Sequence, residues 1–366
     1  MKRTVDKPFL MITSILVLLG FFLFVSASLG LLAREGIEFS SVLFNQIVFG
    51  LIGGSLAMYF TSRINYSFWR KYSFYFFLAA LLITAAVFIP GIGRTANGAT
   101  RWISIGPLPS FQPVELLKLG FVIYLAAWIS GVKGKIRTFQ YGFLPLILVI
   151  GIISGLLLLQ PDTGSVLVIA VAGLAMFVTA GGRWRDVFIA GLIGIIFLAG
   201  LAYSRPYIFD RIETFIKPGE DLQGSSYQLN QSLIAIGSGQ IFGRGFGQSV
   251  QKFNYLPEPI GDSIFAVAAE EWGFVGSTVL IFLFLAFAIR GLKIATWSSD
   301  IFGGLLATGI VILITVQSLV NIASMLGVFP LTGMPLLFVS HGGTALFFAM
   351  AEVGIILNIS KQRQLT

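Results

Sequence analysis

Four carboxylates fall within one short stretch of the chain, YLPEPIGDSIFAVAAEEWGF at residues 255–274. They are Glu258, Asp262, Glu270 and Glu271. A carboxylate near apolar surface can have a raised pKa and serve as a general base. A carboxylate that precedes a helix can instead cap its first turn, and Asp262 has that position. Both roles of Asp262, base and helix cap, stay open. Glu270 and Glu271 are adjacent, so on a helix they should point about 100° apart and not face one site.

A second group of charged residues lies inside apolar segments. Glu115 and Lys118 are three residues apart in QPVELLKLG, so they share a helix face and can pair. They either form an ion pair that packs helices together or line a polar pocket. Asp162, in QPDTG, is placed to cap the next helix. Glu352 lies in the last apolar segment, where we expect it to snorkel or to meet a neighbouring helix.

The residue inventory excludes several kinds of chemistry. The chain has no Cys and a single His, His341, so thiol chemistry and His-based metal sites or triads are excluded. Any acid or base must therefore be Asp, Glu, Lys or Tyr. The glycine-rich segment IGSGQIFGRGFGQS (236–249) lacks the GxxxxGK[ST] spacing of a nucleotide loop, so its glycines should serve tight turns and close packing. Arg244, Lys252 and Arg101, all expected outside the membrane, are candidates to meet a lipid diphosphate.

The composition shows which elements must position these groups. Hydrophobic residues make up 56% of the 366 residues and charged residues only 11%, with a mean hydropathy of +0.90. These values are typical of an integral membrane protein. We predict an all-α fold with ten transmembrane helices, because the apolar segments have the length of a bilayer core. The predicted spans are 8–32, 42–61, 72–90, 113–132, 142–160, 162–180, 186–203, 266–289, 301–326 and 335–358.

Loop charges predict the orientation of these spans. The first span resembles a signal peptide but is too long for one, so we expect an uncleaved anchor. With the N-terminus inside, short inside segments carry most of the Lys and Arg residues, which predicts that both termini are cytoplasmic. This topology also explains the net charge of +8 without any nucleic acid. The longest loop, 205–265, lies outside the membrane, where we expect short helices or tight turns at the membrane surface.

Five motifs in order resemble the SEDS family, the FtsW, RodA and SpoVE proteins of bacterial cell-wall synthesis. The motifs are GATRWISIGPLPSFQPVELLKL (98–119), LLQPDTGSVLV (158–168), YQLNQSLIAIGSGQIFGRGFGQSVQKFNYLPEP (227–259), DSIFAVAAEEWGFVG (262–276) and GMPLLFVSHGGTALFFAMAEVGIILNIS (333–360). The resemblance covers essentially the whole chain, as one polytopic domain over 1–366, and is closer to FtsW and SpoVE than to RodA.

The resemblance implies a peptidoglycan glycosyltransferase that polymerises lipid II at the outer face of the bacterial cytoplasmic membrane. It implies a class B penicillin-binding protein as cross-linking partner, together with other divisome or elongasome membrane proteins. The family's essential acid falls on Asp262, which would act as general base on the acceptor 4-hydroxyl, with undecaprenyl diphosphate as leaving group. The implied substrate-binding positions are Arg101, Trp102, Gln112, Glu115, Lys118, Asp162, Gln228, Ser232, Lys252, Glu258 and Ser340. A divalent cation, Mg²⁺ or Mn²⁺, is a further candidate for stabilising the diphosphate charge.

Two departures from the family pattern concern the environment of the acid. The usual HTDF reads IGDS here, so a His and a Phe beside Asp262 are missing, and the usual SYGGS reads SHGGT, which includes His341. Two other functions compete with polymerisation: a lipid II flippase, and a scaffold that only positions a transpeptidase. A flippase is disfavoured because the polar motifs cluster at one face rather than at the bilayer midplane. A scaffold predicts that Asp262→Asn is silent.

Overall fold

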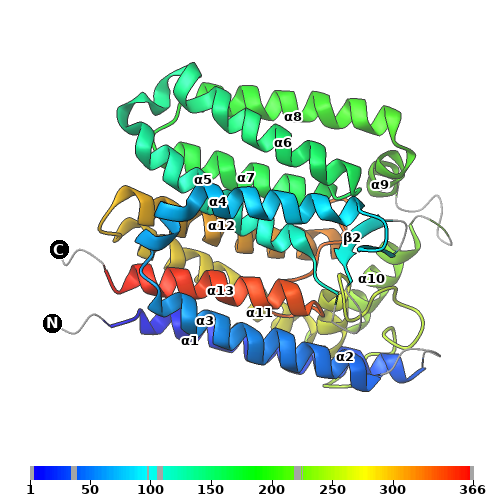
Figure 1. The fold of residues 1–366 in the computed structure, drawn as a ribbon. Coiled ribbons are helices and arrows are strands. Elements are labelled where there is room, and N and C mark those ends of the chain that lie inside the picture. The colour runs from blue at the N-terminus through cyan, green and yellow to red at the C-terminus, as the bar shows by residue number, and fades with distance from the viewer. Residues whose placement is uncertain are drawn as a thin grey trace.

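The structure, a computed structural model, describes residues 4–33, 39–96, 99–104, 110–217, 224 and 226–362. Within these ranges the chain is a bundle of helices with one small antiparallel sheet (Figure 1). The long helices run side by side, and the irregular segments gather at one end, next to α9, α10 and the strands. The start of α1 and the end of α13 meet at the other end, where the Asp6 amide donates to Ser360 Oγ at 3.0 Å.

The helices of the first half are α1 (Lys7–Ser28), α2 (Phe39–Asn45), α3 (Gly54–Arg63), α4 (Ser67–Ala85), α5 (Pro113–Val132), α6 (Leu144–Leu159) and α7 (Thr163–Thr179). Those of the second half are α8 (Trp184–Ser204), α9 (Pro206–Ile216), α10 (Tyr227–Ser238), α11 (Ile264–Thr296), α12 (Ile301–Met325) and α13 (Gly343–Ser360). The strands β1 (Gly93–Ala96) and β2 (Ala99–Ile103) pair with Arg94 opposite Trp102.

The helical class of the fold is confirmed, and the count of ten spans stays a prediction. Among the described residues, nine helices are long and apolar enough to cross a membrane. The remaining predicted span, 162–180, corresponds to α7, an apolar helix of 17 residues. The second span, Val42–Arg63, joins α2 and α3 through a π-helical segment, Gln46–Gly53.

The start of the last predicted span is wrong. The span was expected over 335–358, but α13 begins at Gly343 because residues 333–342 form an irregular apolar segment. Phe338 within it has a φ of 68°, which is incompatible with a helix. Hydropathy alone cannot distinguish this buried loop from the first turns of a helix.

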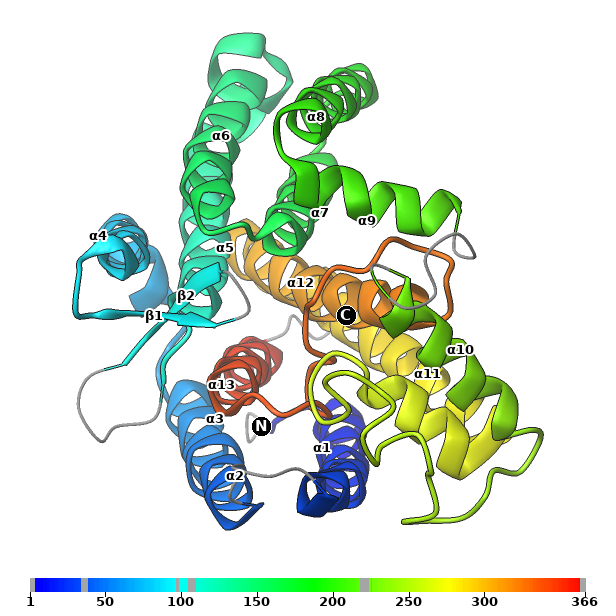
Figure 2. The same cartoon turned by 90° about the vertical axis from the view of Figure 1, so that its right-hand side faces the viewer.

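The centre of the bundle is formed by α12, which contacts α5, α7, α11 and α13 (Figure 2). α5, α12 and α13 bury most of their residues, whereas α8 lies at the periphery and buries none of its apolar side chains. The first helix belongs to the bundle, since Asp6 caps α1 through the Phe9 amide and pairs with Arg290 of α11 at 2.8 Å. In a membrane, the exposed apolar faces fit the hydrocarbon of the bilayer.

The long loop between α8 and α11 contains the short helices expected there. Its described part holds α9, α10 and an irregular stretch from residue 239 to 263. α10 packs against α11 and α12 at the end of the bundle where Asp262 lies. The loop therefore lies across one end of the bundle, next to α1 and α11 (Figure 2).

Candidate active site

Asp262 lies in the last turn of this loop, immediately before α11. Its Oδ2 atom accepts a hydrogen bond from Gln228 Nε2 of α10 at 3.2 Å. Its Oδ1 atom is buried and accepts no hydrogen bond from the part of the chain that is described. A buried oxygen without a donor is rare in native proteins and marks an acceptor that is available for a ligand. Asp262 is therefore a carboxylate with one free oxygen at the mouth of the bundle.

The expectation that Asp262 caps the following helix is wrong. The N-cap residue of α11 is Ser263, and no side chain accepts a hydrogen bond from the first turn. Gln228 holds both residues, since its Nε2 atom also donates to Ser263 Oγ at 3.0 Å. The Asp262 carboxylate is thereby linked to α10 and not to the first turn of α11. The cap predicted at Asp162 is confirmed, because Asp162 Oδ1 accepts from the Ser165 amide at 3.1 Å.

The surroundings of Asp262 raise the pKa of its carboxylate, which is still mostly ionised at neutral pH. Burial, together with the negative charge of Glu258, raises the pKa of Asp262 to about 6. The Gln228 hydrogen bond and the positive charge of Arg211 oppose this shift. A base works best when its pKa lies near the operating pH. The loop therefore tunes Asp262 without the His and Phe that are usual beside this acid.

One arginine, Arg211, lies beside Asp262, and a second, Arg101, lies near Arg211. Arg211, on α9, donates from Nη1 to the Thr332 carbonyl at 3.3 Å. A Cβ atom placed on Gly333 would lie 3.8 Å from Arg211 Nη2 and 3.9 Å from Asp262 Oδ2, so both groups border the same space. Arg101, on β2, donates to the carbonyls of Gln160 and Pro161. Burial and the charge of Arg101 lower the pKa of Arg211, as expected for two cations side by side.

The sequence motifs did not single out Arg211. Its proximity to Asp262 depends on the path of α9, which brings Arg211 to Thr332 and Gly333. The hydrogen-bond partners of Arg101 are main-chain carbonyls, which carry no charge and therefore do not neutralise the guanidinium. Arg211 and Arg101 together form a positive region that meets the free carboxylate at Arg211 and is suited to an anionic ligand.

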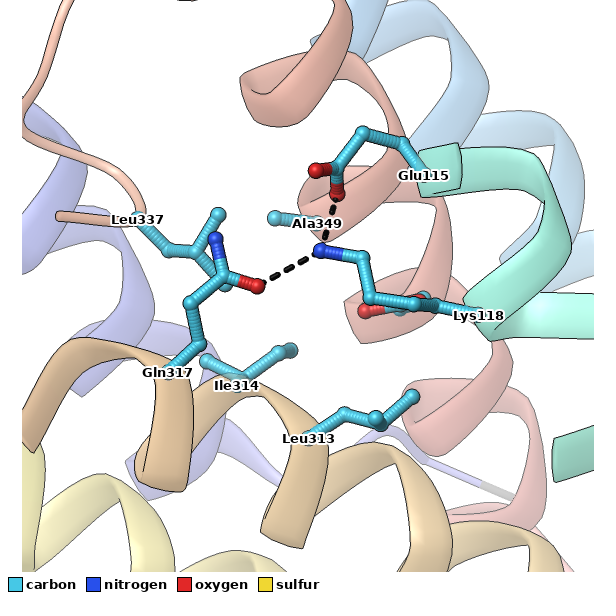
Figure 3. A pocket seen from close by; sticks show the side chains of 8 residues that line it. Glu115, Lys118, Leu313, Ile314, Gln317, Leu337 and Ala349 are labelled. Atoms are coloured by element: carbon cyan, nitrogen blue, oxygen red, sulfur yellow. Dashed lines mark hydrogen bonds and ion pairs between the residues drawn. The ribbon is translucent and has the colours of Figure 1, made fainter. Parts of the chain in front are cut away.

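The predicted pair of Glu115 and Lys118 forms, and the two residues also line a small cavity (Figure 3). Lys118 Nζ lies 2.7 Å from Glu115 Oε2 and donates to Gln317 Oε1 of α12 at 2.6 Å. Glu352 of α13 lines the same cavity, so it meets neighbouring helices, which was one of the two expectations for this residue. Both alternatives for the pair therefore hold at once. Lys118 is buried and has two partners within the bundle, Glu115 and Gln317, so its predicted contact with a substrate stays a prediction.

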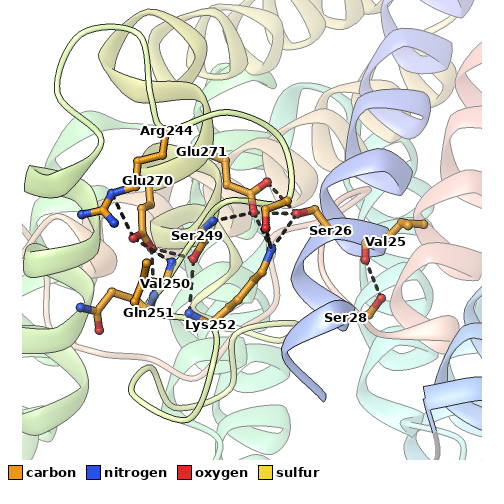
Figure 4. Close-up of polar contacts among 11 residues, drawn as sticks. Val25, Ser26, Ser28, Arg244, Ser249, Val250, Gln251, Lys252, Glu270 and Glu271 are labelled. Carbon is orange, nitrogen blue, oxygen red and sulfur yellow. Dashed lines mark hydrogen bonds and ion pairs between the residues drawn. The ribbon is translucent and has the colours of Figure 1, made fainter. Parts of the chain in front are cut away.

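Glu270 and Glu271 belong to a different kind of site (Figure 4). Lys252 Nζ lies 2.8 Å from Glu271 Oε1, and both side chains are fully buried. Glu271 also accepts from Ser26 Oγ of α1 at 2.6 Å. Glu270 accepts from Ser249 Oγ at 2.6 Å and from two main-chain amides of the loop. These carboxylates are saturated with donors and hold the loop against two helices.

The expectation that the two adjacent glutamates cannot face one site is wrong. Ser249 donates from its hydroxyl to Glu270 and from its amide to Glu271, at 2.6 and 3.3 Å. The helix directs the side chains apart, but the loop wraps around and meets both. Lys252, expected to bind substrate, is occupied inside this network and does not face an open site.

The glycine-rich segment closes a break in α11. Gly273 has a φ of 66°, which interrupts the helix and frees main-chain groups. The amides of Arg244 and Gly245 donate to the carbonyls of Glu270 and Glu271, both at 3.0 Å. A Cβ atom on Gly243 would lie 2.1 Å from the Glu271 carbonyl oxygen, so no larger residue fits there. Close packing, and not phosphate binding, explains these glycines.

The remaining predicted site residues have mixed surroundings. Ser232 is fully buried and donates to the Gln228 carbonyl, so it supports α10 and faces no ligand. Ser340 is buried and donates to the Gly261 carbonyl at 2.6 Å, next to Asp262. Glu258 lies in the same loop, with a φ of 46°. Trp102 and Gln112 are partly exposed at the entrance between β2 and α5.

The described residues do not form a dedicated metal site. No group of three or more His, Asp or Glu side chains among them is arranged to hold a metal ion. The charges that act on Asp262 are those of one carboxylate, Glu258, and one guanidinium, Arg211. The residues present thus do not fit a protein-held divalent cation, and no step of the mechanism is derived through one.

The chain is similar to known proteins over its whole length. A family model described as "Cell cycle protein", FTSW_RODA_SPOVE, matches residues 7–365. The stage V sporulation protein E of Bacillus subtilis (strain 168) is 36% identical, over 98% of this chain and 98% of its own length. The probable peptidoglycan glycosyltransferase FtsW of Trichlorobacter lovleyi is 37% identical, over 98% of this chain and 96% of its own.

Solved structures share the fold. The rod shape determining protein RodA of Thermus thermophilus matches with a TM-score of 0.72 and 28% identity, over 99% of this chain and 98% of its own. A chain from a structure described as "Structural coordination of polymerization and crosslinking by a peptidoglycan synthase complex" matches with a TM-score of 0.79 and 28% identity, over 97% of both chains.

Proposed function

The chain belongs to the FtsW, RodA and SpoVE family, and on this premise we propose that it is a peptidoglycan glycosyltransferase that polymerises lipid II. The observation that carries the proposal is the Asp262 carboxylate, which keeps one buried oxygen free beside a positive region. The chain is a multi-pass membrane protein. We assign the end that carries Asp262 to the outer face and both termini to the cytoplasm, as the loop charges predict.

In the proposed reaction, Asp262 takes the proton of the acceptor 4-hydroxyl. The acceptor oxygen then forms a bond to the anomeric carbon of the donor sugar. The bond from that carbon to the diphosphate oxygen breaks, and its electron pair leaves with undecaprenyl diphosphate. The proton held on Asp262 is released to water. No protein nucleophile is needed when the anomeric centre inverts.

The two arginines stabilise the charge that develops on the leaving group. Arg211 and Arg101 carry positive charge on the side of Asp262 where the diphosphate of a lipid substrate would lie. Fixed charges aimed at a developing anion are among the largest contributions to catalysis. Gln228 orients the carboxylate, and the partly exposed Trp102 and Gln112 border the entrance for the sugars.

The proposed partner is a class B penicillin-binding protein that cross-links the new strand. Support comes from the structural relative that was solved as part of a peptidoglycan synthase complex. Other membrane proteins of the divisome or elongasome complete the assembly in this proposal, and the whole chain, 1–366, acts as one polytopic domain.

The test uses purified protein in liposomes that contain lipid II. Wild type should produce glycan polymer, visible as a ladder on a gel, with and without an added divalent cation. Asp262→Asn should produce none while its melting temperature shows an intact fold. Polymer from Asp262→Asn at the wild-type rate contradicts the proposal. Translocation of lipid II by wild type without any polymer does so as well, and would indicate a flippase.

A further inference from the structure

Three consecutive carbonyl groups of the loop that ends in Asp262 are held from outside the loop. Their donors come from two other elements, α12 and the segment before α13. The bonds run from the His341 amide to the Ile260 carbonyl at 2.7 Å, from Ser340 Oγ to the Gly261 carbonyl at 2.6 Å, and from Asn321 Nδ2 to the Asp262 carbonyl at 2.8 Å. We call this arrangement the carbonyl clamp.

The side-chain donors of the carbonyl clamp are themselves fixed. Asn321 is 1% exposed, and its Nδ2 atom also donates to the Met334 carbonyl at 2.7 Å. Ser340 is 5% exposed, and its Oγ atom accepts from the Leu336 amide at 2.8 Å. Each donor thus joins the Asp262 loop to the segment from 334 to 341. The Asn321 Oδ1 atom accepts no hydrogen bond from the described residues, so this side chain acts through its Nδ2 donor alone. Buried hydrogen bonds of this kind restrict the backbone to one geometry.

The Asn321 end of the carbonyl clamp continues into the bundle. Gln317 lies one turn before Asn321 on α12, so the two side chains share a helix face. Gln317 Nε2 donates to the Pro335 carbonyl at 3.3 Å, while its Oε1 atom accepts from Lys118 Nζ at 2.6 Å. The buried pair of Glu115 and Lys118 therefore connects to the loop through α12.

The carboxylate itself has little else to orient it. Gln228 supplies its one side-chain hydrogen bond, at 3.2 Å, and Oδ1 accepts none from the described residues. The direction of the side chain is then set mainly by the main chain that carries it. Displacement of a reacting group by about 1 Å can reduce a rate by about 100-fold.

We propose that Asn321 and Ser340 are positioning residues, which hold the Asp262 main chain so that its carboxylate meets the acceptor hydroxyl. Neither side chain faces the substrate space in this arrangement, because both are buried and directed at carbonyl groups. This assignment gives Ser340 a role different from substrate binding. It rests on the proposed glycosyltransferase function.

The test compares Asn321→Leu and Ser340→Ala with two matched variants. Ser318→Ala removes a buried hydroxyl of α12, which donates to the Ile314 carbonyl of its own helix. Ser340→Thr keeps the hydroxyl. The kcat for lipid II polymerisation should fall about 10- to 100-fold in Asn321→Leu and Ser340→Ala, with KM within about twofold of wild type. Ser318→Ala should keep the wild-type kcat, and Ser340→Thr should regain most of it.

Other outcomes overturn the assignment. A wild-type kcat in folded Asn321→Leu and Ser340→Ala means that the carbonyl clamp does not position the base. A loss of kcat that accompanies an equal rise in KM and a lowered melting temperature, and that Ser340→Thr does not rescue, means that the two residues only stabilise the fold. Absence of polymer from wild type, in contrast, contradicts the proposed function and not the carbonyl clamp.

Discussion

The carboxylates at 262 and at 270–271 belong to one short segment but have opposite surroundings. Glu270 and Glu271 are buried and saturated by hydroxyl, amide and ammonium donors. Asp262 has one amide donor and a buried oxygen that accepts nothing from the described residues. A saturated carboxylate binds a loop to its helices, whereas an unsaturated one keeps its affinity for a proton or a ligand. Satisfaction by donors, more than burial, separates the structural acids from the chemical one.

The largest effect on stability should come from breaking the buried pair. Lys252→Met leaves Glu271 charged, buried and without its cation, which should cost about 3–5 kcal/mol of unfolding free energy. Chemical unfolding in detergent measures this loss. The double variant Lys252→Met with Glu271→Leu should recover most of it, because an apolar pair of similar volume replaces the ion pair. A neutral Lys252→Met would show that the network is not structural.

The second effect is a gain in stability, and it depends on pH. The folded-state pKa of Asp262, about 6, is above the ordinary value of 3.8, so the fold favours the protonated form. The resulting stabilisation is complete below pH 3.8 and is lost as the pH rises through about 6. Asp262→Asn, which mimics the protonated acid, should have a larger free energy of unfolding than wild type at pH 8, by up to about 3 kcal/mol. The two proteins should have the same free energy of unfolding at pH 4, as chemical unfolding in detergent can measure. Equal free energies of unfolding of the two proteins at both pH values would contradict a raised pKa of Asp262.

A third effect should appear in substrate affinity. Arg211→Gln removes a positive charge beside Asp262 and should raise KM for lipid II roughly tenfold, the scale of one hydrogen bond to a charged group. Arg205→Gln is the matched control, because Arg205 is an exposed cation at the start of the same helix. The comparison of KM values between the two variants is the measurement. Equal KM values would remove Arg211 from the diphosphate site.

The smallest effect should come from the exposed member of the saturated network. Arg244 is 42% exposed, and its Nε atom lies 3.5 Å from Glu270 Oε1. Because exposed ion pairs contribute little, Arg244→Ala should cost about 0.5 kcal/mol or less. Unfolding by urea or detergent measures the loss of unfolding free energy in Arg244→Ala and in Lys252→Met, so that the two losses can be compared. A loss as large as that of Lys252→Met would mean that the loop depends on this cation too.

Local features of the site could be predicted from the sequence. The Asp162 cap and the pair of Glu115 and Lys118 join residues three apart, and both form. The cap at Asp262 failed because Ser263 takes that position and Gln228, from another helix, holds the carboxylate. The capping rule considers only neighbours in the sequence, so it could not include a hydrogen bond from Gln228 of α10.

Contacts between distant segments lay beyond sequence reasoning. Lys252 pairs with Glu271 because the loop folds back over a break at Gly273. Arg211 reaches the site through the path of α9. One signal was available for Asn321, since it and Gln317 are amide side chains one turn apart in an apolar span. Their spacing places both on one buried face.

The pH dependence of kcat/KM tests the central claim, that Asp262 acts as the base. Wild-type protein in liposomes is assayed with lipid II between pH 5 and pH 8, with folding and substrate binding followed in parallel. Because the ionised carboxylate must take the proton, kcat/KM should fall about tenfold for each pH unit below about 6. A flat profile over this range, from protein that stays folded and still binds lipid II, would contradict the claim.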